Sequence, residues 1–118
     1  MDKITPITIT NEAGEVVYTL EFSRETVSQA ERSGFDINKV DSMPMTLIPL
    51  LFYWAFKMHH PNIKREKTDQ ILYEEIGGLN SAVSKRLQEL YYAPFETLLQ
   101  DDEEEGTERK NSKFKVLL

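Results

Sequence analysis

The chain has 118 residues, no cysteine and a formal net charge of −6, with a pI near 4.9. This length fits one domain, and the absence of cysteine excludes disulfide bonds, thiolate metal sites and thiol nucleophiles. An acidic chain lacks the clustered lysine and arginine that phosphate contacts need, so we expect no nucleic-acid partner. The densest basic group, residues 64–67, is interrupted by Glu66 and is typical of a solvated helix start. No signal peptide is visible, which predicts a cytoplasmic location.

Two strands are predicted at the start of the chain. Ile7 and Ile9 alternate with threonines, and apolar residues occupy every second position of residues 16–22. Residues 11–15 between them are typical of a turn, with Gly14 free to adopt a positive φ. The pattern predicts a β-hairpin. Because an isolated hairpin is marginally stable in water, its apolar face is expected to lie on helices.

A first helix is predicted over residues 24–33. Ser23 is a suitable N-cap, and Gly34 is a suitable residue for a left-handed C-cap. Residues 35–40 then form a connector, whose apolar side chains are expected to insert at the edge of the core: Phe35, Ile37 and Val40.

Residues 43–58 are the most apolar stretch, with twelve apolar side chains among sixteen residues. A helix that is apolar all round is either central in a domain or spans a membrane. This stretch is shorter than the roughly 20 residues that a bilayer needs. We therefore predict the central helix of a small domain and no membrane association. Asp41 or Ser42 is expected to cap it, with Pro44 near its first turn. Pro49 is expected either to kink the helix or to mark a start near Thr46, which would place Pro49 in the first turn.

Two further helices complete the predicted fold. One runs over residues 65–76, with an apolar side of Ile71, Leu72 and Ile76. The next is capped by Asn80 or Ser81 and extends to about residue 100, with Pro94 kinking or dividing it. Its apolar positions are Val83, Leu87, Leu90 and Tyr91. The predicted fold class is α+β and mainly α: an N-terminal β-hairpin packed on a bundle of about four helices.

The composition changes abruptly at residue 101. Residues 101–105 are all acidic, and the polar residues that follow have too little hydrophobicity to form a core. We predict a helical domain with an N-terminal hairpin over residues 1–100 and an acidic disordered tail over residues 101–118. The last five residues are apolar again and are interpreted either as a short docking peptide or as the scar of a reading-frame end.

No catalytic, metal or cofactor motif is present in the sequence. His59 and His60 are adjacent, and adjacent side chains on a helix point about 100° apart, so they do not readily chelate one ion. The glycine pair at residues 77–78 is not followed by the Gly-Lys of a phosphate-binding loop. The sequence predicts a protein that is not an enzyme and that has no catalytic residue, no metal site and no cofactor.

Aromatic side chains are the candidate binding residues. They occupy nearly every side of the central helix and recur in residues 91–95, while the neighbouring helices offer few apolar side chains to cover them. Excess exposed apolar area usually marks an interaction surface, although a fully buried core helix is the alternative interpretation. The candidate partner-binding residues are Phe52, Tyr53, Trp54, Phe56, Tyr91, Tyr92 and Phe95. The same surplus predicts a homo-oligomer.

The order of these features resembles one known family. The series comprises the hairpin end and first helix start at residues 18–27, residues 30–37, the apolar residues 44–56 with His-His at 59–60, and Leu-Tyr-Tyr-Ala-Pro-Phe-Glu-Thr-Leu at residues 90–98. It resembles the tail assembly chaperones of long-tailed phages and prophages of Gram-positive bacteria, over about residues 15–99. The shared signals are hydrophobic patterns, and the acidic tail lies outside the match.

The resemblance implies a non-enzymatic role in virion assembly. Such chaperones bind and solubilise the tape-measure protein in the host cytoplasm. They are displaced as tail tube protein polymerises, and are absent from the mature virion. An apolar surplus on helices would suit an amphipathic helical client. Two other classes stay open: a small phage adaptor or regulatory protein, and a structural component such as a head–tail connector subunit.

Overall fold

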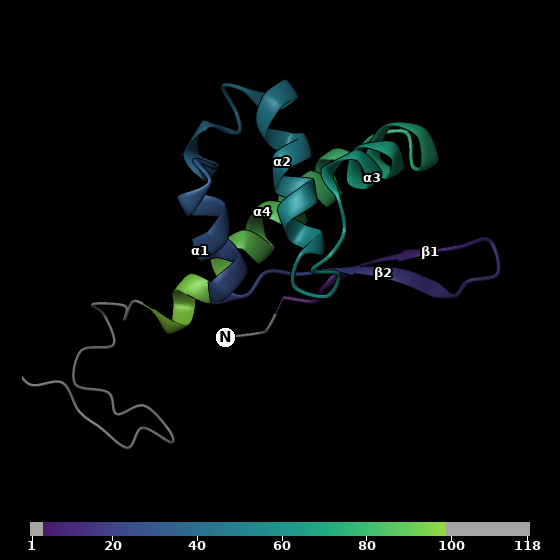
Figure 1. Cartoon of the computed structure of the whole chain (residues 1–118), viewed down its shortest axis with the longest axis horizontal. Coiled ribbons are helices and arrows are strands. Elements are labelled where there is room, and N and C mark those ends of the chain that lie inside the picture. The colour runs from purple at the N-terminus through teal and green to yellow at the C-terminus, as the bar shows by residue number, and fades with distance from the viewer. Residues whose placement is uncertain (1–3, 99–118) are drawn as a thin grey trace, which may run out of the picture.

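The computed structural model describes residues 4–98 of the chain. In this part, an antiparallel two-stranded hairpin is followed by four α-helices with short helical turns between and after them (Figure 1). The predicted class, α+β and mainly α with an N-terminal hairpin on about four helices, is confirmed. The predicted acidic tail, residues 101–118, lies outside the described residues.

The hairpin pairs β1 (Ile7–Thr10) with β2 (Val16–Leu20) in antiparallel register. Its turn is held by Asn11, whose Oδ1 accepts hydrogen bonds from two backbone N–H groups at 3.0 Å. Gly14 has a φ of 82°, as the turn prediction requires. The end of the hairpin nearest the turn extends away from the helices as an arm (Figure 1).

The apolar face of the hairpin is formed by cross-strand pairs. Ile7 lies opposite Leu20 and Ile9 opposite Tyr18, and these four residues pack at the core or against it. A shift of register next to Ile9 then leaves Val17 without a directly opposed residue, which is a β-bulge. The alternation predicted for the whole second strand therefore ends before the arm, where the valines of β2 are exposed.

Helix α1 (Arg24–Arg32) begins at a capping box. The Ser23 hydroxyl accepts from the N–H of Thr26 at 3.1 Å, and the Thr26 hydroxyl accepts from the N–H of Ser23 at 2.9 Å. Gly34 follows with a φ of 99°, so both predicted helix signals are confirmed. The connector forms one 3₁₀ turn, η1 (Ile37–Lys39), and places the predicted apolar side chains at the core: Phe35 and Val40 buried, and Ile37 half-buried.

Helix α2 (Pro44–Phe56) is the centre of the fold, because it contacts β2, α1, η1, α3 and α4. The predicted caps and the start near Thr46 were wrong, whereas Pro44 lies in the first turn as predicted. Neither Asp41 nor Ser42 caps the helix; Met43 is the N-cap residue and makes no side-chain cap bond. Pro49 lies inside the helix, not in its first turn. The hydrogen bond that Pro49 cannot donate would end on the carbonyl of Met45, in an exposed turn where water can replace the donor.

Helix α3 (Arg65–Gln70) continues into a π-helical turn, η2 (Ile71–Glu75). The N–H of Ile76 donates to the carbonyl of Ile71 at 2.9 Å, which is the wider spacing of a π-helix. This extra residue per turn rotates Ile76 out of the core, so that it is 40% exposed. The predicted apolar side of this helix is therefore right for Ile71 and Leu72 and wrong for Ile76.

Helix α4 (Ser81–Tyr92) is capped by Asn80, whose Oδ1 accepts from the N–H of Val83 at 2.8 Å. As predicted, Pro94 ends the regular helix, and the chain continues as a 3₁₀ turn, η3 (Ala93–Thr97). The α4 side chains that reach the core are Leu87, Leu90 and Tyr91.

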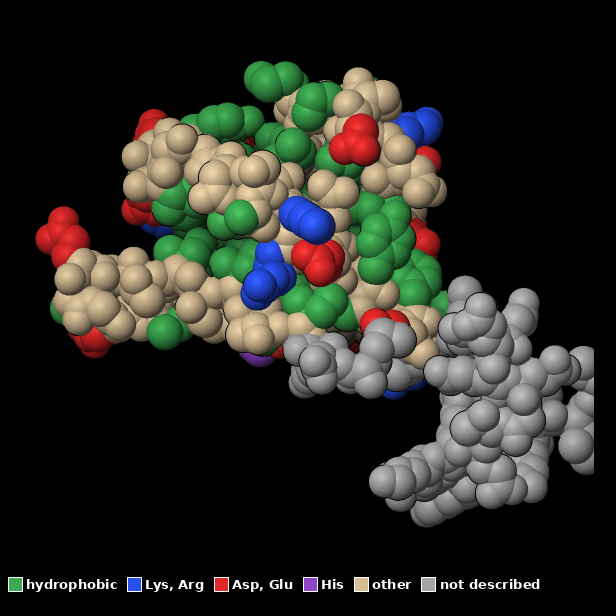
Figure 2. All heavy atoms as spheres, turned by 180° about the vertical axis from the view of Figure 1, so that it is seen from behind, with side chains coloured by type: hydrophobic (Ala, Val, Ile, Leu, Met, Phe, Trp, Pro, Cys, Tyr) green, Lys and Arg blue, Asp and Glu red, His purple; other side chains and the backbone are tan. Residues whose placement is uncertain are grey.

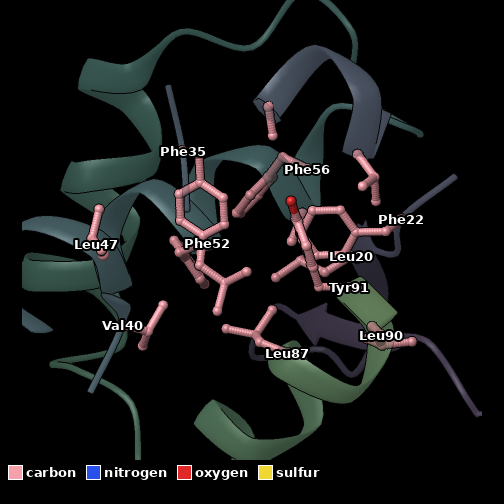
Figure 3. Close-up of a cluster of buried hydrophobic side chains, with 14 of the residues drawn as sticks. Leu20, Phe22, Phe35, Val40, Leu47, Phe52, Phe56, Leu87, Leu90 and Tyr91 are labelled. Atoms are coloured by element: carbon pink, nitrogen blue, oxygen red, sulfur yellow. The ribbon is translucent and has the colours of Figure 1, made fainter. Parts of the chain in front are cut away.

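The core lies where α1, α2, α4 and β2 meet, and most of it is aromatic or aliphatic (Figure 3). Tyr91 from α4 packs against Phe22 and Phe35, with ring centroids 5.2 and 5.4 Å apart. Phe52 and Phe56 pack edge to face at 4.9 Å. Such pairs are favoured by the quadrupoles of the rings as well as by burial.

None of the helices within residues 4–98 has the length and apolar character required to cross a membrane.

Candidate functional site

Three of the seven predicted partner-binding residues belong to the core. Phe52, Phe56 and Tyr91 are each at most 1% exposed (Figure 3). The sequence predicted more apolar surface on the central helix than its neighbours could cover. In the structure, the hairpin and three other helices pack around α2 and cover most of this surface. In this conformation these three rings hold the fold together and are not available to a partner.

Tyr91 also differs electrostatically from an ordinary tyrosine. Burial, followed by the negative charge of Glu31, the neighbouring Tyr92 and the charge of Asp36, raises the pKa of Tyr91 to about 12. The phenol is therefore neutral at physiological pH, and its position in the aromatic cluster indicates a packing role.

Tyr53 and Trp54 lie half-buried on α2, with their rings edge to face at 5.2 Å. The ammonium group of Lys57 lies 5.2 Å from the centroid of the Tyr53 ring and donates to the carbonyl of Pro61 at 2.8 Å. This cation–π contact and hydrogen bond fix the C-terminal end of α2. The indole Nε1 of Trp54 is buried and has no hydrogen-bond partner among the described residues.

We expect Trp54→Phe to change the free energy of unfolding by less than about 1 kcal/mol, because a buried donor without an acceptor costs about 1–3 kcal/mol and its removal offsets the lost contacts. Urea unfolding followed by far-UV circular dichroism measures the change. Leu51→Ala, on the same helix and fully buried, is the control and should cost about 2–5 kcal/mol. A loss for Trp54→Phe as large as for the control would show that the indole N–H is satisfied.

The remaining two predicted residues, Tyr92 and Phe95, line a pocket where α4 passes into η3. It has a volume of about 400 Å³ and is lined by Ile4, Glu89, Tyr92, Ala93, Phe95 and Glu96. We call it the end-of-α4 pocket. The rings of Tyr92 and Phe95 lie 6.1 Å apart between centroids, and Tyr92 is 46% exposed. Tyr91 and Tyr92 are neighbours in the sequence but point in different directions on the helix, so that Tyr91 faces the core and Tyr92 faces this pocket.

The segment before β1 completes the end-of-α4 pocket. The guanidinium of Arg86 donates to the carbonyl of Thr5 at 3.2 Å and holds this segment against α4. Ile4 can therefore line the pocket although it lies far from Phe95 in sequence. Both charged residues of the lining, Glu89 and Glu96, are acidic and exposed. The pocket is suited to an apolar side chain carried by a segment with lysine or arginine beside it.

A second exposed apolar area lies at the start of α2. Met45 is 82% exposed and Met43 47%. The exposed apolar side chains of the apolar stretch therefore lie in its first turn and at its last residue, Met58, and not among the aromatic residues between them. Seen from the opposite side to Figure 1, the helical body shows several hydrophobic areas separated by few charges (Figure 2).

The two histidines have a structural role that the sequence did not indicate. Nε2 of His60 accepts a hydrogen bond from the N–H of Thr19 at 3.1 Å, and Nε2 of His59 lies 2.9 Å from the carboxylate of Glu21. Between these contacts the N–H of Glu21 donates to the carbonyl of Ala55 at 2.9 Å. The end of α2 thus covers the outer edge of β2. Nothing in the sequence places residues 59–60 next to a strand about forty residues earlier, because the contact is set by tertiary packing.

Comparison with known proteins identifies a family. A family model described as a domain of unknown function, DUF5055, matches residues 1–118. The chain belongs to the DUF5055 family. Searches of curated proteins and of solved structures returned no match.

Within residues 4–98, the DUF5055 domain contains no group of three or more histidine and acidic side chains placed to hold a metal ion. The described residues do form an apolar pocket lined in part by two glutamates, an exposed methionine turn and a projecting hairpin. These features suit binding to another polypeptide.

Proposed function

We propose that this protein is a non-enzymatic tail assembly chaperone that binds and solubilises the tape-measure protein of a long-tailed phage or prophage. The observation that carries the proposal is the end-of-α4 pocket, because it brings together Tyr92 and Phe95 from the Leu-Tyr-Tyr-Ala-Pro-Phe-Glu-Thr-Leu series on which the family resemblance rests. Leu90 and Tyr91 of the same series belong to the core beneath this end of α4.

The pocket fits a helical, amphipathic client. One apolar side chain of the client packs against Tyr92 and Phe95, and a basic residue one helical turn away pairs with Glu89 or Glu96. The exposed turn with Met43 and Met45 offers a second, adaptable apolar contact. The acidic net charge keeps the loaded complex soluble. In this role the protein acts in the host cytoplasm, self-associates, is displaced by tail tube protein and does not remain in the virion.

Co-expression with the tape-measure protein tests the proposal. We expect a soluble complex that is recovered by pull-down, and no copies of this chain in purified virions by mass spectrometry. Insolubility of the tape-measure protein with no association would refute the chaperone role. Recovery of the chain from virions would instead support a structural component.

We expect Tyr92→Ser with Phe95→Ser to reduce recovery of the tape-measure protein at least about tenfold, since two apolar anchors of an interface usually contribute more than 1.4 kcal/mol together. The matched control is Tyr73→Ser, because Tyr73 is 55% exposed on η2 and lies outside the pocket. Equal recovery with the pocket variant and the control would exclude the pocket as the client site. Circular dichroism of both variants checks that the fold is kept.

A further inference from the structure

The lining of the end-of-α4 pocket combines apolar side chains with charges of one sign only. Its apolar lining residues are Ile4, Tyr92, Ala93 and Phe95, and its charged lining residues are two glutamates. An apolar pocket with acidic side chains alone at its rim favours a segment in which apolar residues alternate with lysine or arginine.

The chain itself contains such a segment. Residues 109–118 carry four basic residues and no acidic one, and they end in Phe114-Lys-Val-Leu-Leu. Residues 101–108, in contrast, carry six acidic residues and no basic one. The charges of the C-terminal part are thus separated into an acidic half, which Glu89 and Glu96 repel, and a basic apolar half, which they attract.

We propose that residues 114–118 occupy the end-of-α4 pocket of the same chain. In an extended segment, Phe114 and Val116 project to one side and Lys115 to the other. The apolar pair then fills the space beside Tyr92 and Phe95, while Lys113 or Lys115 reaches the glutamates. This inference concerns the chain alone; under the proposed function, the client would displace residues 114–118 from the pocket.

The length of the connection favours an occupant from the same chain. Fifteen residues lie between Leu98 and Phe114, and a flexible chain of that length spans roughly 19–23 Å on average. The lining of the pocket extends to Glu96, two residues before Leu98, so the connection does not need to stretch. A short flexible linker gives an effective concentration in the millimolar range, on the order of a thousand times a micromolar solution of a second copy.

Disulfide trapping tests this placement, because the chain has no cysteine of its own. The test pair is Ala93→Cys with Val116→Cys, which keeps both glutamates and every lysine. The comparison pair is Ala93→Cys with Thr107→Cys. For an undocked chain the shorter loop of the comparison pair should close about twofold faster. If the segment is docked, the test pair should instead form its intramolecular disulfide at least about fivefold faster than the comparison pair in oxidised glutathione.

A matched variant separates docking from cysteine reactivity. Adding Phe114→Ser and Leu118→Ser to the test pair removes apolar side chains on the pocket side of the segment, keeps the loop length and the charges, and should slow disulfide formation to the rate of an undocked chain. Raising the salt concentration should slow the test pair as well, since the charge attraction is screened. Non-reducing mass spectrometry reads each product. Faster closure of the Thr107 pair, no effect of the serines, or disulfide-linked dimers at low micromolar concentration would each overturn the proposal.

Discussion

We expect Phe56→Ala to lower the free energy of unfolding by about 3–5 kcal/mol, the range for removing a buried phenylalanine. Phe56 has no exposed surface, and its ring contacts Phe52 at 4.9 Å and Tyr18 at 5.3 Å between centroids. The substitution would open a cavity where α2 meets the hairpin, so neither element could close it alone. Urea unfolding followed by circular dichroism measures the loss.

Met45→Ala is the matched control, because Met45 lies on the same helix and is 82% exposed. A surface substitution of this kind should change stability by no more than about 0.5 kcal/mol. The comparison also tests the assignment of the central aromatics to the core. If Phe56→Ala left stability unchanged but abolished binding of the client, the ring would belong to an interface and the packing described above would be wrong.

The second large effect is expected at His60. His60→Ala should lower the free energy of unfolding by about 2 kcal/mol near pH 7.5, because the N–H of Thr19 loses its acceptor and the hairpin loses a ring contact. The His60 ring lies 5.3 Å from that of Tyr18. His59→Ala is the control, since its contact with Glu21 is an exposed pair that is expected to contribute less than about 1 kcal/mol.

The contribution of His60 should also depend on pH. Burial, together with the positive charge of His59, lowers the pKa of His60 below its ordinary value of 6.5. The unfolded chain therefore binds a proton more readily than the folded one. The stability that His60 provides is complete above about pH 6.5 and is lost as the pH falls below that value through the lowered pKa. Protonation of Nε2 also removes the acceptor for Thr19.

Unfolding curves at pH 5.5 and pH 7.5 measure this dependence. We expect the protein with His60 to lose more stability between these values than the His60→Ala variant does, while His59→Ala, which removes only the smaller cause of the lowered pKa of His60, keeps most of that loss. Equal slopes for all three proteins would show that the histidine contact with Thr19 does not titrate. Because the hydrogen bond joins α2 to β2, hydrogen exchange at Thr19 should report the same loss locally.

The burial of the central aromatics changes where a partner can bind. The predicted surface lay along Phe52–Phe56, but the structure leaves only Tyr53 and Trp54 half-exposed there. Tyr92 and Phe95 keep their place as candidates, together with the exposed methionines at the start of α2. The prediction of a homo-oligomer rested on exposed apolar surface along the central helix. Because most of that surface is buried, the prediction now depends on these smaller exposed areas. Light scattering at micromolar concentration would test it.

The sequence by itself determined most of the local structure. Ser23, Gly34 and Asn80 mark helix ends through interactions with residues a few positions away, so their signals survive without tertiary information. The alternation of Ile7 and Ile9 fixed the face of the hairpin, and the apolar density of residues 43–58 identified the central helix. The family resemblance over residues 15–99 likewise depends on such hydrophobic patterns.

Only the tertiary structure decided which apolar residues remain accessible. An all-round apolar helix has no polar face in its sequence to show its orientation, so the burial of Phe56 and the exposure of Met45 depend on where β2, α1, α3 and α4 pack. The π-turn that exposes Ile76, the contact of His60 with Thr19 and the presence of Ile4 in the end-of-α4 pocket are equally non-local. Each is set by packing between segments that are distant in the chain or by a change of helical pitch, which residue periodicity does not encode.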